Sequence, residues 1–188
     1  AQKFDGEIIS ADSRQVYKSM DIGTGKEWGN VPIYGYDLVD PKSDFSVSQY
    51  LKFAQKILTD IWRRQKLPIL AGGTGLYVKG IIDGIATADI PRNTELRAKL
   101  EGKSIADLYE NLSQLDAVRA GSMNTSDKKN PRRLIRAIEI ATWKLEHGDT
   151  SHAYTPHLRH PTSLLMIGLT APKKKLDERI AARVKFRV

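Results

Sequence analysis

The sequence contains no cysteine and no long apolar run, and both absences narrow its class. Without cysteine there is no disulfide, no thiol nucleophile and no cysteine-based zinc site. The apolar runs are far too short to cross a bilayer, and the opening "AQKFDGE" lacks the basic and apolar regions of a signal peptide. With ordinary apolar and charged content, this composition predicts a soluble cytoplasmic protein that does not contact a membrane.

A complete Walker A phosphate loop is also missing, although one stretch contains part of its pattern. Gly23, Gly25 and Lys26 form a Gly-x-Gly-Lys sequence. A Walker A loop needs a further glycine, separated by four residues from its Gly-Lys pair, and Ser or Thr after the lysine. Met20 and Glu27 occupy those two places. We therefore interpret the stretch as a simple turn.

Acidic residues are outnumbered, with 22 Asp and Glu against 30 Lys and Arg and a formal net charge of +8. A basic excess of this size favours a polyanionic partner, of which nucleic acid is the commonest. From charge alone, a basic protein without such a partner is an equally good interpretation of this excess. The histidines show no metal-ligand spacing, because His152, His157 and His160 lie in a predicted loop without carboxylate partners, and no metal site is predicted.

The first part of the sequence alternates between predicted strands and helices. Short β-branched runs favour buried strands, and an apolar stripe favours a helix that begins at Ser46, where Gln49 completes capping-box spacing. The predicted strands are 6–11, 33–41 and 67–71, and the predicted helices are 46–65 and 76–84. This alternation predicts a parallel α/β sheet.

The later part, from about residue 86 to residue 160, predicts helices and loops without a strand. One helix is marked by Asn130 as N-cap, Pro131 at its first position and Gly148 beyond its end. The predicted helices are 104–115, 130–148 and 172–184, and a buried strand is predicted at 163–171. The α/β pattern is thus interrupted by a helical stretch and then resumed.

These patterns predict an α/β parallel-sheet core over residues 1–90 and 161–188, with a helical insertion domain over residues 91–160. The chain begins with Ala1 and not with Met, and its first residues look like the last turn of a helix. It also stops within an amphipathic pattern. We therefore expect the sequence to be part of a longer protein.

Asp12 follows directly after the first predicted strand. Ligands of open parallel sheets bind beyond the carboxyl ends of the strands, which is where Asp12 lies. A carboxylate there can be a catalytic base or a metal ligand. The alternative, weighed about equally, is that Asp12 or Ser13 caps a short helix over residues 14–20.

A glycine-rich turn follows the strand at 67–71. Gly72, Gly73, Thr74 and Gly75 lead from this strand into a helix. Glycines let backbone N–H groups approach an anion, and a helix N-terminus favours negative charge. Thr74 can cap the helix or donate to a substrate. Tight strand-to-helix turns are common, so the pattern also fits a turn without a ligand.

Basic residues crowd the start of the helix at 130–148. They are Lys128, Lys129, Arg132, Arg133 and Arg136. The helix dipole is positive at this end, so cations there are unfavourably placed. A bound phosphate, shared by backbone N–H groups and guanidinium groups, would explain them. A solvated basic turn is the alternative.

Four stretches, in this order, resemble the tRNA dimethylallyltransferases, also called tRNA isopentenyltransferases. They are "GEIISADSRQVYKSMDIGTGK", "YDLVDPKSDFSVSQY", "LAGGTGLYVKGIIDG" and "NPRRLIRAIEI". The resemblance runs from about Gly6 to Val184 and is weakest between Glu101 and Ser126. Gly25 departs from the family pattern, in which Ala is usual at that place.

The resemblance implies a fold, a reaction and partners. The fold is a nucleotide-kinase-like (P-loop type) α/β core with a helical insertion that grips the anticodon stem-loop of tRNA. The reaction moves a dimethylallyl group from dimethylallyl diphosphate to N6 of an adenosine beside the anticodon. The family's P-loop, which holds the diphosphate and Mg²⁺, would precede Ala1, so this chain is expected to hold no cofactor-binding residue and no metal ligand. A monomer is expected.

The resemblance also implies roles for individual residues. Asp12 would be the catalytic base, and Thr74 would hydrogen-bond the RNA near the reacting adenosine. Arg132, Arg133 and Arg136 would hold phosphates of the anticodon stem. The residues implied to contact tRNA are Asp12, Ser13, Arg14, Gln15, Thr74, Arg132, Arg133, Leu134, Ile135 and Arg136.

Two alternative functions remain at this point. One is an adenylate isopentenyltransferase, which prenylates free nucleotides, or a nucleotide kinase on the same core. The helical insertion argues against it, because a small substrate needs no such arm. The other is a non-catalytic RNA-binding relative, against which the retained Asp12 loop argues.

Overall fold

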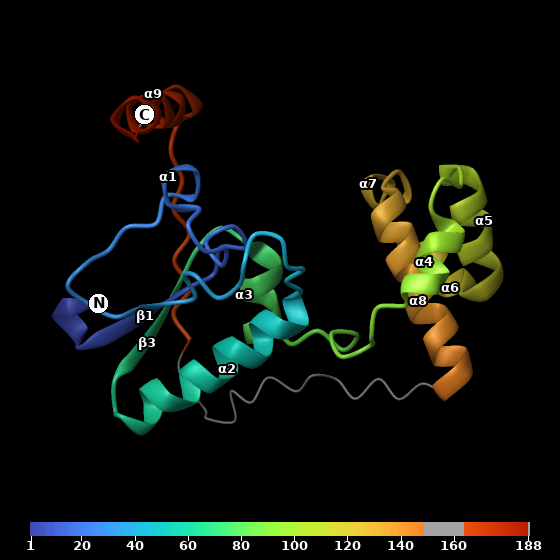
Figure 1. The fold of residues 1–188 in the computed structure, drawn as a ribbon, viewed down its shortest axis with the longest axis horizontal. Coiled ribbons are helices and arrows are strands. Elements are labelled where there is room, and N and C mark those ends of the chain that lie inside the picture. Colours follow the sequence, from blue (N-terminus) through green and yellow to red (C-terminus); the bar gives the residue numbers. More distant parts are fainter. Residues whose placement is uncertain (149–163, 188) are drawn as a thin grey trace. The chain divides into compact units, whose positions relative to one another are not determined.

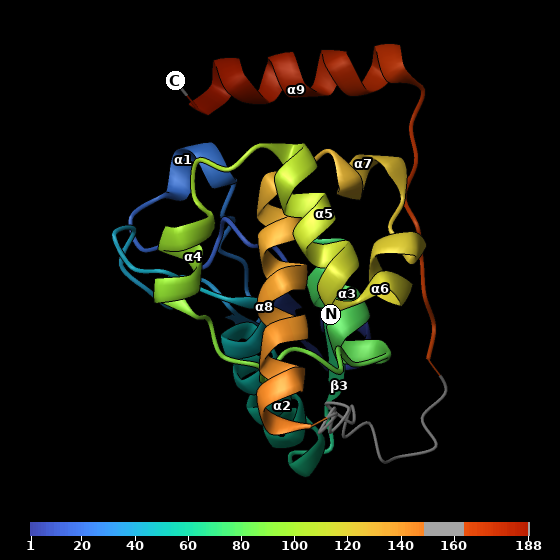
Figure 2. The same cartoon turned by 90° about the vertical axis from the view of Figure 1, so that its right-hand side faces the viewer.

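The computed structural model describes residues 1–148 and 164–187, and these divide into two compact units. The described residues of Ala1–Gly84 and Pro156–Val188 form the first unit, and those of Ile85–Thr155 form the second. Figures 1 and 2 show the two units from two sides. The predicted domain limits at 90/91 and 160/161 stay predictions. His152, His157 and His160 lie outside the described residues.

A three-stranded parallel sheet forms the centre of the first unit. Its strands are β1 (Gly6–Ser10), β2 (Ile33–Tyr34) and β3 (Leu67–Ala71), in the order β2-β1-β3. Ile8 of β1 pairs with Ile33 on one side and with Ile69 on the other. The predicted parallel α/β core is therefore present, with β1 as its buried middle strand.

The two outer strands differ from their predictions. β2 is much shorter than the predicted 33–41, because Gly35 takes a positive φ of 100° and turns the chain. β3 lies at the edge of the sheet and is only half buried, whereas a buried strand was expected. The strand predicted at 163–171 is absent from its described part, residues 164–171, whose apolar side chains are exposed. None of the described strands pairs with this segment, and an unpaired segment leaves its backbone groups to solvent.

The first unit also contains helices that lie before, between and after its strands in the sequence (Figure 1). They are η1 (Gln2–Phe4), α1 (Asp21–Thr24), α2 (Val47–Arg63), α3 (Gly75–Ile82) and α9 (Lys173–Arg187). The predicted capping box of α2 is confirmed, with Ser46 and Gln49 bonded reciprocally. Tyr50 of α2 stacks on Tyr77 of α3 with 3.7 Å between ring centroids, and its hydroxyl donates to the Ser10 carbonyl. This stack fixes both helices near the end of β1.

The short helix predicted at 14–20 does not form. Its backbone groups instead bond to the segment after β2: Leu38 N and Val39 N donate to the Val16 carbonyl, and Lys18 N donates to the Val39 carbonyl. Tyr17 and Val39 form an isolated parallel bridge. These bonds take the acceptors and donors that a helix would need, so the chain after Asp12 is a series of turns.

The second unit is a small helical bundle around α8 (Figure 2). Its helices are α4 (Thr94–Leu100), α5 (Ile105–Leu115), α6 (Ala117–Ser122), α7 (Thr125–Lys128) and α8 (Pro131–His147). The predicted cap at Asn130 is present, Ser104 caps α5, and Gly148 ends α8 with a positive φ of 76°. The core consists of Leu100, Leu108, Leu112, Ala120, Met123, Leu134, Ala137 and Ile138. No described helix of either unit is long and apolar enough to cross a membrane.

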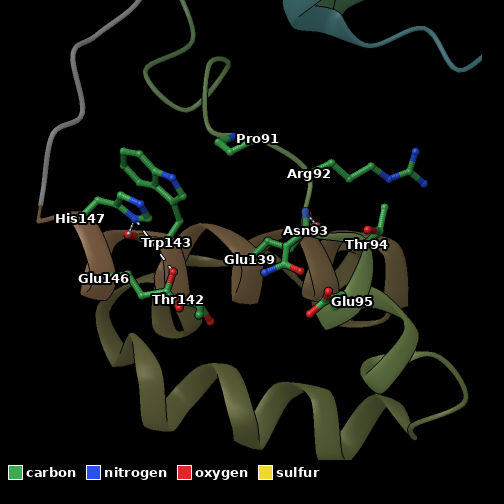
Figure 3. A pocket seen from close by; sticks show the side chains of 10 residues that line it. All are labelled: Pro91, Arg92, Asn93, Thr94, Glu95, Glu139, Thr142, Trp143, Glu146 and His147. Atoms are coloured by element: carbon green, nitrogen blue, oxygen red, sulfur yellow. Dashed lines mark hydrogen bonds and ion pairs between the residues drawn. The ribbon is translucent and has the colours of Figure 1, made fainter.

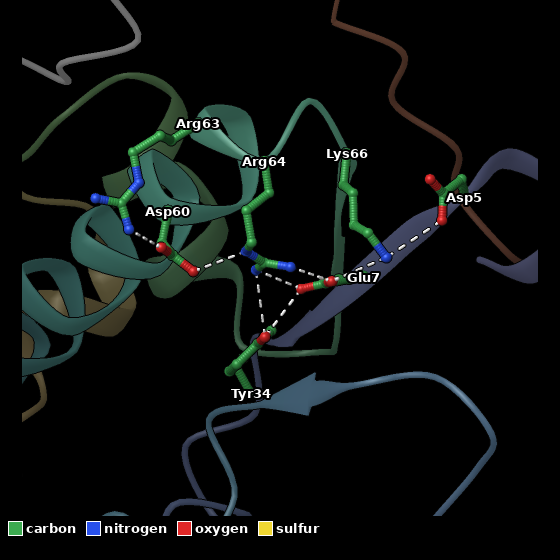
Figure 4. Close-up of polar contacts among 7 residues, drawn as sticks. All are labelled: Asp5, Glu7, Tyr34, Asp60, Arg63, Arg64 and Lys66. Atoms are coloured by element: carbon green, nitrogen blue, oxygen red, sulfur yellow. Dashed lines mark hydrogen bonds and ion pairs between the residues drawn. The ribbon is translucent and has the colours of Figure 1, made fainter.

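Glu7 lies inside the first unit, at the beginning of β1, and is surrounded by cations (Figure 4). The Arg64 guanidinium grips its carboxylate through both oxygens, with 2.7 Å from Nη2 to Oε2. Tyr34 donates to Oε2 at 2.9 Å, and Lys66 lies 3.4 Å from Oε1. The hydrogen bonds from Arg64 outweigh the effect of burial and lower the pKa of Glu7 to about 2.

We predict that Glu7 makes the stability of the first unit sensitive to acid. Because its pKa falls from 4.5 to about 2 on folding, the unfolded chain binds more protons between these pH values. The stabilisation is therefore complete above about pH 4.5 and is lost as the pH falls towards about 2. Glu7→Gln should lower the free energy of unfolding by roughly 1.5–3 kcal/mol at neutral pH.

Urea unfolding, followed by circular dichroism over this pH range, measures the effect. The difference between wild type and Glu7→Gln should shrink as the pH falls, because protonated Glu7 resembles glutamine. Glu110→Gln, an exposed change on α5, is the control and should leave the unfolding free energy within about 0.5 kcal/mol of wild type. A difference that stays constant down to about pH 2 would contradict the assignment.

Candidate functional site

Two loops meet where the parallel strands β1 and β3 end. The Ala11 amide donates to the Ala71 carbonyl at 2.7 Å, and the Thr74 amide donates to the Ala11 carbonyl at 2.9 Å. Thr74 stands at the N-cap position of α3, but its side chain makes no cap bond. Its hydroxyl oxygen instead accepts the Ser13 amide at 2.9 Å and lies 3.2 Å from the Ser13 hydroxyl. The Asp12 loop and the glycine-rich turn are thus one hydrogen-bonded assembly.

Gly72 makes this close approach possible. A Cβ at position 72 would lie 2.4 Å from both the carbonyl carbon and the carbonyl oxygen of Ala11. No side chain fits in that distance. At Gly73, by contrast, a Cβ would meet nothing within 4 Å. The first glycine of the turn is therefore required by packing of the two loops.

Asp12 uses its side chain in a turn. Its Oδ1 accepts the Arg14 amide two residues further on, at 2.8 Å, which is the bond of an Asx turn. The alternative expectation was that Asp12 caps a short helix. In the structure its side chain closes a turn instead. The pKa of the nearby Tyr77 is raised to about 12. Burial of the tyrosine is the main cause, and electrostatic interactions with Tyr17 and Asp12 add to it.

Both the oxygen and the nitrogen of the Gln15 side-chain amide form hydrogen bonds within the first unit. Its Oε1 accepts the Ser10 hydroxyl at 2.6 Å, and its Nε2 donates to the carbonyls of Thr24 and Gly25 at 3.1 and 3.3 Å. Its predicted role of lining a substrate would break these bonds. Arg14 is exposed, and no described side chain pairs with its guanidinium. Gln15 therefore supports the loop from within, and its contact with tRNA stays a prediction.

Part of the basic start of α8 is neutralised within the second unit. Asn130 caps the helix by accepting the amides of Arg132 and Arg133. The Arg133 guanidinium forms an ion pair with Asp127, and the Lys128 ammonium lies 5.1 Å from the centre of the Tyr109 ring. The expectation that these cations need a bound anion is therefore only partly met. No described residue pairs with the side chain of Arg132, which is exposed.

Arg136 holds the chain that leads into the second unit. Its Nη2 donates to the carbonyls of Thr87 and Ile90 at 3.0 and 2.9 Å. It also approaches buried Glu139, which Arg97 grips with two bonds of 2.6 Å. Burial opposes the charge of Glu139, but the hydrogen bonds from Arg97 and the Asn93 amide outweigh it and lower the pKa of Glu139. Arg136 thus acts as an internal clamp in this structure, and its role as a phosphate contact stays a prediction.

Two further residues predicted to contact tRNA point into the core. The side chain of Leu134 is fully buried, and Ile135 packs against the same cluster. Neither offers its side chain to RNA while the bundle is folded. Leu134 belongs to the apolar stripe of α8. This pattern in the sequence already argued against assigning its side chain to an RNA contact.

A pocket of about 420 Å³ lies in the second unit, between α8 and the segment that leads into α4 (Figure 3). At one end Trp143 and His147 stack with 4.6 Å between ring centroids. Its lining residues are Pro91, Arg92, Asn93, Thr94, Glu95, Glu139, Thr142, Trp143, Glu146 and His147. Sequence reasoning did not predict it, because it depends on the long-range pairing of this segment with α8.

The described residues contain no group of three or more His, Asp or Glu side chains that could hold a metal ion. Asp12, at the meeting point of the loops, accepts the Arg14 amide and belongs to no such group among the described residues. An Mg²⁺ ion needs several oxygen ligands. The described residues thus form no all-protein Mg²⁺ site, and water and substrate phosphates would have to supply most ligands of a bound ion.

Comparison with protein families matches residues 15–188 to the model described as IPP transferase. The chain belongs to the IPP transferase family. Asp12, Ser13 and Arg14 lie just before the matched residues. The predicted family is confirmed, and so is the predicted fold class, since the solved structures that the chain resembles are isopentenyltransferases and dimethylallyltransferases.

Relatives are found among curated proteins. The chain is 42% identical over 194 residues to tRNA dimethylallyltransferase 2 of Treponema denticola, covering 100% of the chain and 63% of that protein. It is 38% identical to tRNA dimethylallyltransferase of Treponema pallidum, covering 100% of the chain and 60% of that protein. The chain thus spans less than two thirds of these relatives.

Solved structures give the same result. A full-length tRNA isopentenylpyrophosphate transferase from Bacillus halodurans matches with a TM-score of 0.59 and 35% identity, over 100% of the chain and 59% of that protein. A eukaryotic dimethylallyltransferase described as acting on tRNA matches with a TM-score of 0.62 and 27% identity, over 78% of the chain and 39% of that protein.

Proposed function

We propose that this chain is part of an enzyme that transfers a dimethylallyl group from dimethylallyl diphosphate to N6 of an adenosine beside the tRNA anticodon. The observation that carries the proposal is the hydrogen-bonded assembly of the Asp12 loop and the Thr74 turn, at the carboxyl ends of β1 and β3. Ligands of parallel sheets bind at such ends. The family and the names of the relatives support this substrate class.

Asp12 is the proposed general base. The exocyclic amine of adenine is a poor nucleophile, because its lone pair is delocalised into the ring. In the reaction, N6 forms a bond to C1 of the dimethylallyl group, the bond from C1 to the diphosphate oxygen breaks, and the diphosphate leaves with the electron pair. The Asp12 carboxylate takes the proton that N6 loses. The Arg14 amide on Oδ1 orients this carboxylate.

The neighbouring polar groups bind and orient the adenosine in this proposal. An adenine that is to react at N6 must leave its stack in the anticodon loop. The Ser13 and Thr74 hydroxyls lie 3.2 Å apart beside Asp12, and either can donate to the extruded nucleotide. Arg14 is exposed at the same loop and suits an RNA phosphate.

The proposal includes Mg²⁺ and the diphosphate because the family resemblance implies both. Mg²⁺, when bound, would share the negative charge of the leaving group. We place the enzyme in the cytoplasm, working as a monomer on tRNA.

Transfer to tRNA, compared with transfer to AMP, tests the proposed function. The full-length protein is incubated with dimethylallyl diphosphate, Mg²⁺ and either unmodified tRNA or AMP, and products are identified by mass spectrometry. We expect a prenylated adenosine in the anticodon loop and none on AMP. Transfer to AMP alone would identify an adenylate isopentenyltransferase. Binding of tRNA without transfer would identify a non-catalytic relative.

We predict that Asp12→Asn lowers the single-turnover rate of transfer by roughly a hundred- to ten-thousand-fold, because the proton from N6 loses its acceptor. Asparagine keeps the acceptor oxygen for the Arg14 amide, so the loop and tRNA affinity should stay close to wild type. The measurement is quenched-flow transfer beside a tRNA binding titration. A rate within about threefold of wild type would leave Asp12 as a turn-forming residue only.

Arg132 and Arg136 should respond differently to alanine, although both belong to the basic start of α8. Arg132 is exposed, so Arg132→Ala should reduce the slope of log K against log salt for tRNA binding by about one unit or less. Arg136→Ala should leave that slope unchanged and lower the unfolding free energy by roughly 1–3 kcal/mol, because carbonyls lose a charged donor. An unchanged slope for Arg132→Ala would contradict its role as a phosphate contact.

A further inference from the structure

The Lys26 ammonium is turned into the first unit, where each of its three hydrogens has an oxygen acceptor. It donates to the Tyr17 carbonyl at 2.7 Å, to Asp21 Oδ1 at 2.8 Å and to Asp37 Oδ1 at 2.6 Å. Its side chain has no exposed surface. Burial opposes the charge, but the hydrogen bonds to Asp21 and Asp37 outweigh it and raise the pKa of Lys26. A lysine of a Gly-x-Gly-Lys sequence is thus used internally and does not point out towards a phosphate.

The three acceptors of Lys26 come from three separate segments. Tyr17 belongs to the turns that follow Asp12, Asp21 begins α1, and Asp37 follows β2. A lost ammonium would therefore remove a contact that the three segments share, while backbone hydrogen bonds still join the Tyr17 and Asp37 segments. Asp37 also has a left-handed backbone, with φ 56°, which turns its amide to the Gln15 carbonyl at 3.2 Å.

Gln15 connects this cluster with the Asp12 loop. Its Nε2 donates to the carbonyls of Thr24 and Gly25, the two residues directly before Lys26. Its Oε1 accepts from Ser10 at the end of β1. Gln15 is thus bonded to the residues around Lys26 on one side and to the strand that carries Asp12 on the other.

We propose that Lys26 is a positioning residue for the Asp12 loop. By joining Tyr17, Asp21 and Asp37, it holds α1 against Gln15, and Gln15 holds the turn that presents Asp12 and Arg14. The other side of the loop is held by Thr74. Lys26 acts through these groups and does not touch the substrate. The catalytic consequence rests on the proposed function, whereas the effect on the loop does not.

Hydrogen exchange tests the effect on the loop without any substrate. Lys26→Met removes the ammonium. Lys26→Met/Asp37→Asn also removes the carboxylate that would be left half-buried, while Asp21 is more exposed and can be solvated. In both variants the Ser13 and Arg14 amides should exchange roughly tenfold or more faster than in wild type. Lys18→Met, an exposed lysine of the same turns, is the control and should leave both amides unchanged.

Single-turnover transfer to tRNA in the full-length protein tests the catalytic consequence. The double variant should keep the circular dichroism spectrum of the fold and lose roughly ten- to a hundred-fold in rate, with tRNA affinity within about twofold of wild type. A rate within about twofold of wild type would overturn the proposal, and so would a rate loss with unchanged amide exchange. If wild type itself transfers nothing to tRNA, the proposed function fails, and the exchange experiment alone decides the role of Lys26.

Discussion

The close approach of Gly72 to the Ala11 carbonyl is the constraint on which the candidate site depends. Parallel pairing brings the ends of β1 and β3 side by side, and a residue without a side chain lets the two following loops touch. The Thr74 amide and hydroxyl then bond to Ala11 and Ser13. Two stretches that are sixty residues apart in sequence thus become one polar surface with Asp12 in it.

Some of the cationic side chains are used inside the fold, and others are exposed to solvent. Four cationic side chains each hold a buried or half-buried carboxylate, or carbonyls that would otherwise lack a donor. They are Lys26, Arg64, Arg97 and Arg136. These cations stabilise the fold, because removing one partner of a buried pair leaves an unpaired charge. Internal ion pairs contribute no net charge, so the excess of +8 belongs to the residues outside these pairs. Arg132 is the clearest external candidate at the start of α8, since no described residue pairs with it.

Local signals account for what could be predicted from the sequence. The capping box at Ser46, the cap at Asn130 and the parallel strands at 6–11 and 67–71 depend on neighbouring residues and on short apolar runs, so they were visible. The inward turn of Lys26 and the clamp of Arg136 depend on acceptors brought together only by folding.

Other predictions failed because tertiary contacts override local preference. Residues 14–20 look helical, yet their backbone groups bond to residues 38 and 39 and form turns. The apolar run at 164–171 looks like a strand, yet no described strand pairs with it. The placement of Asp12 beyond β1 was predicted. The use of Gln15 as an internal bridge was not, since its partners lie at the end of β1 and at the end of α1.

The effect of Gly72→Ala on prenyl transfer tests most directly whether the joined loops form the active site. A Cβ at this position would lie 2.4 Å from the Ala11 carbonyl and must push the loops apart. Gly29→Ala, where a Cβ meets nothing within 4 Å, is the matched control. The account predicts that Gly72→Ala lowers the single-turnover rate on tRNA by roughly a hundred-fold with tRNA affinity retained. A rate within about threefold of the control would contradict it.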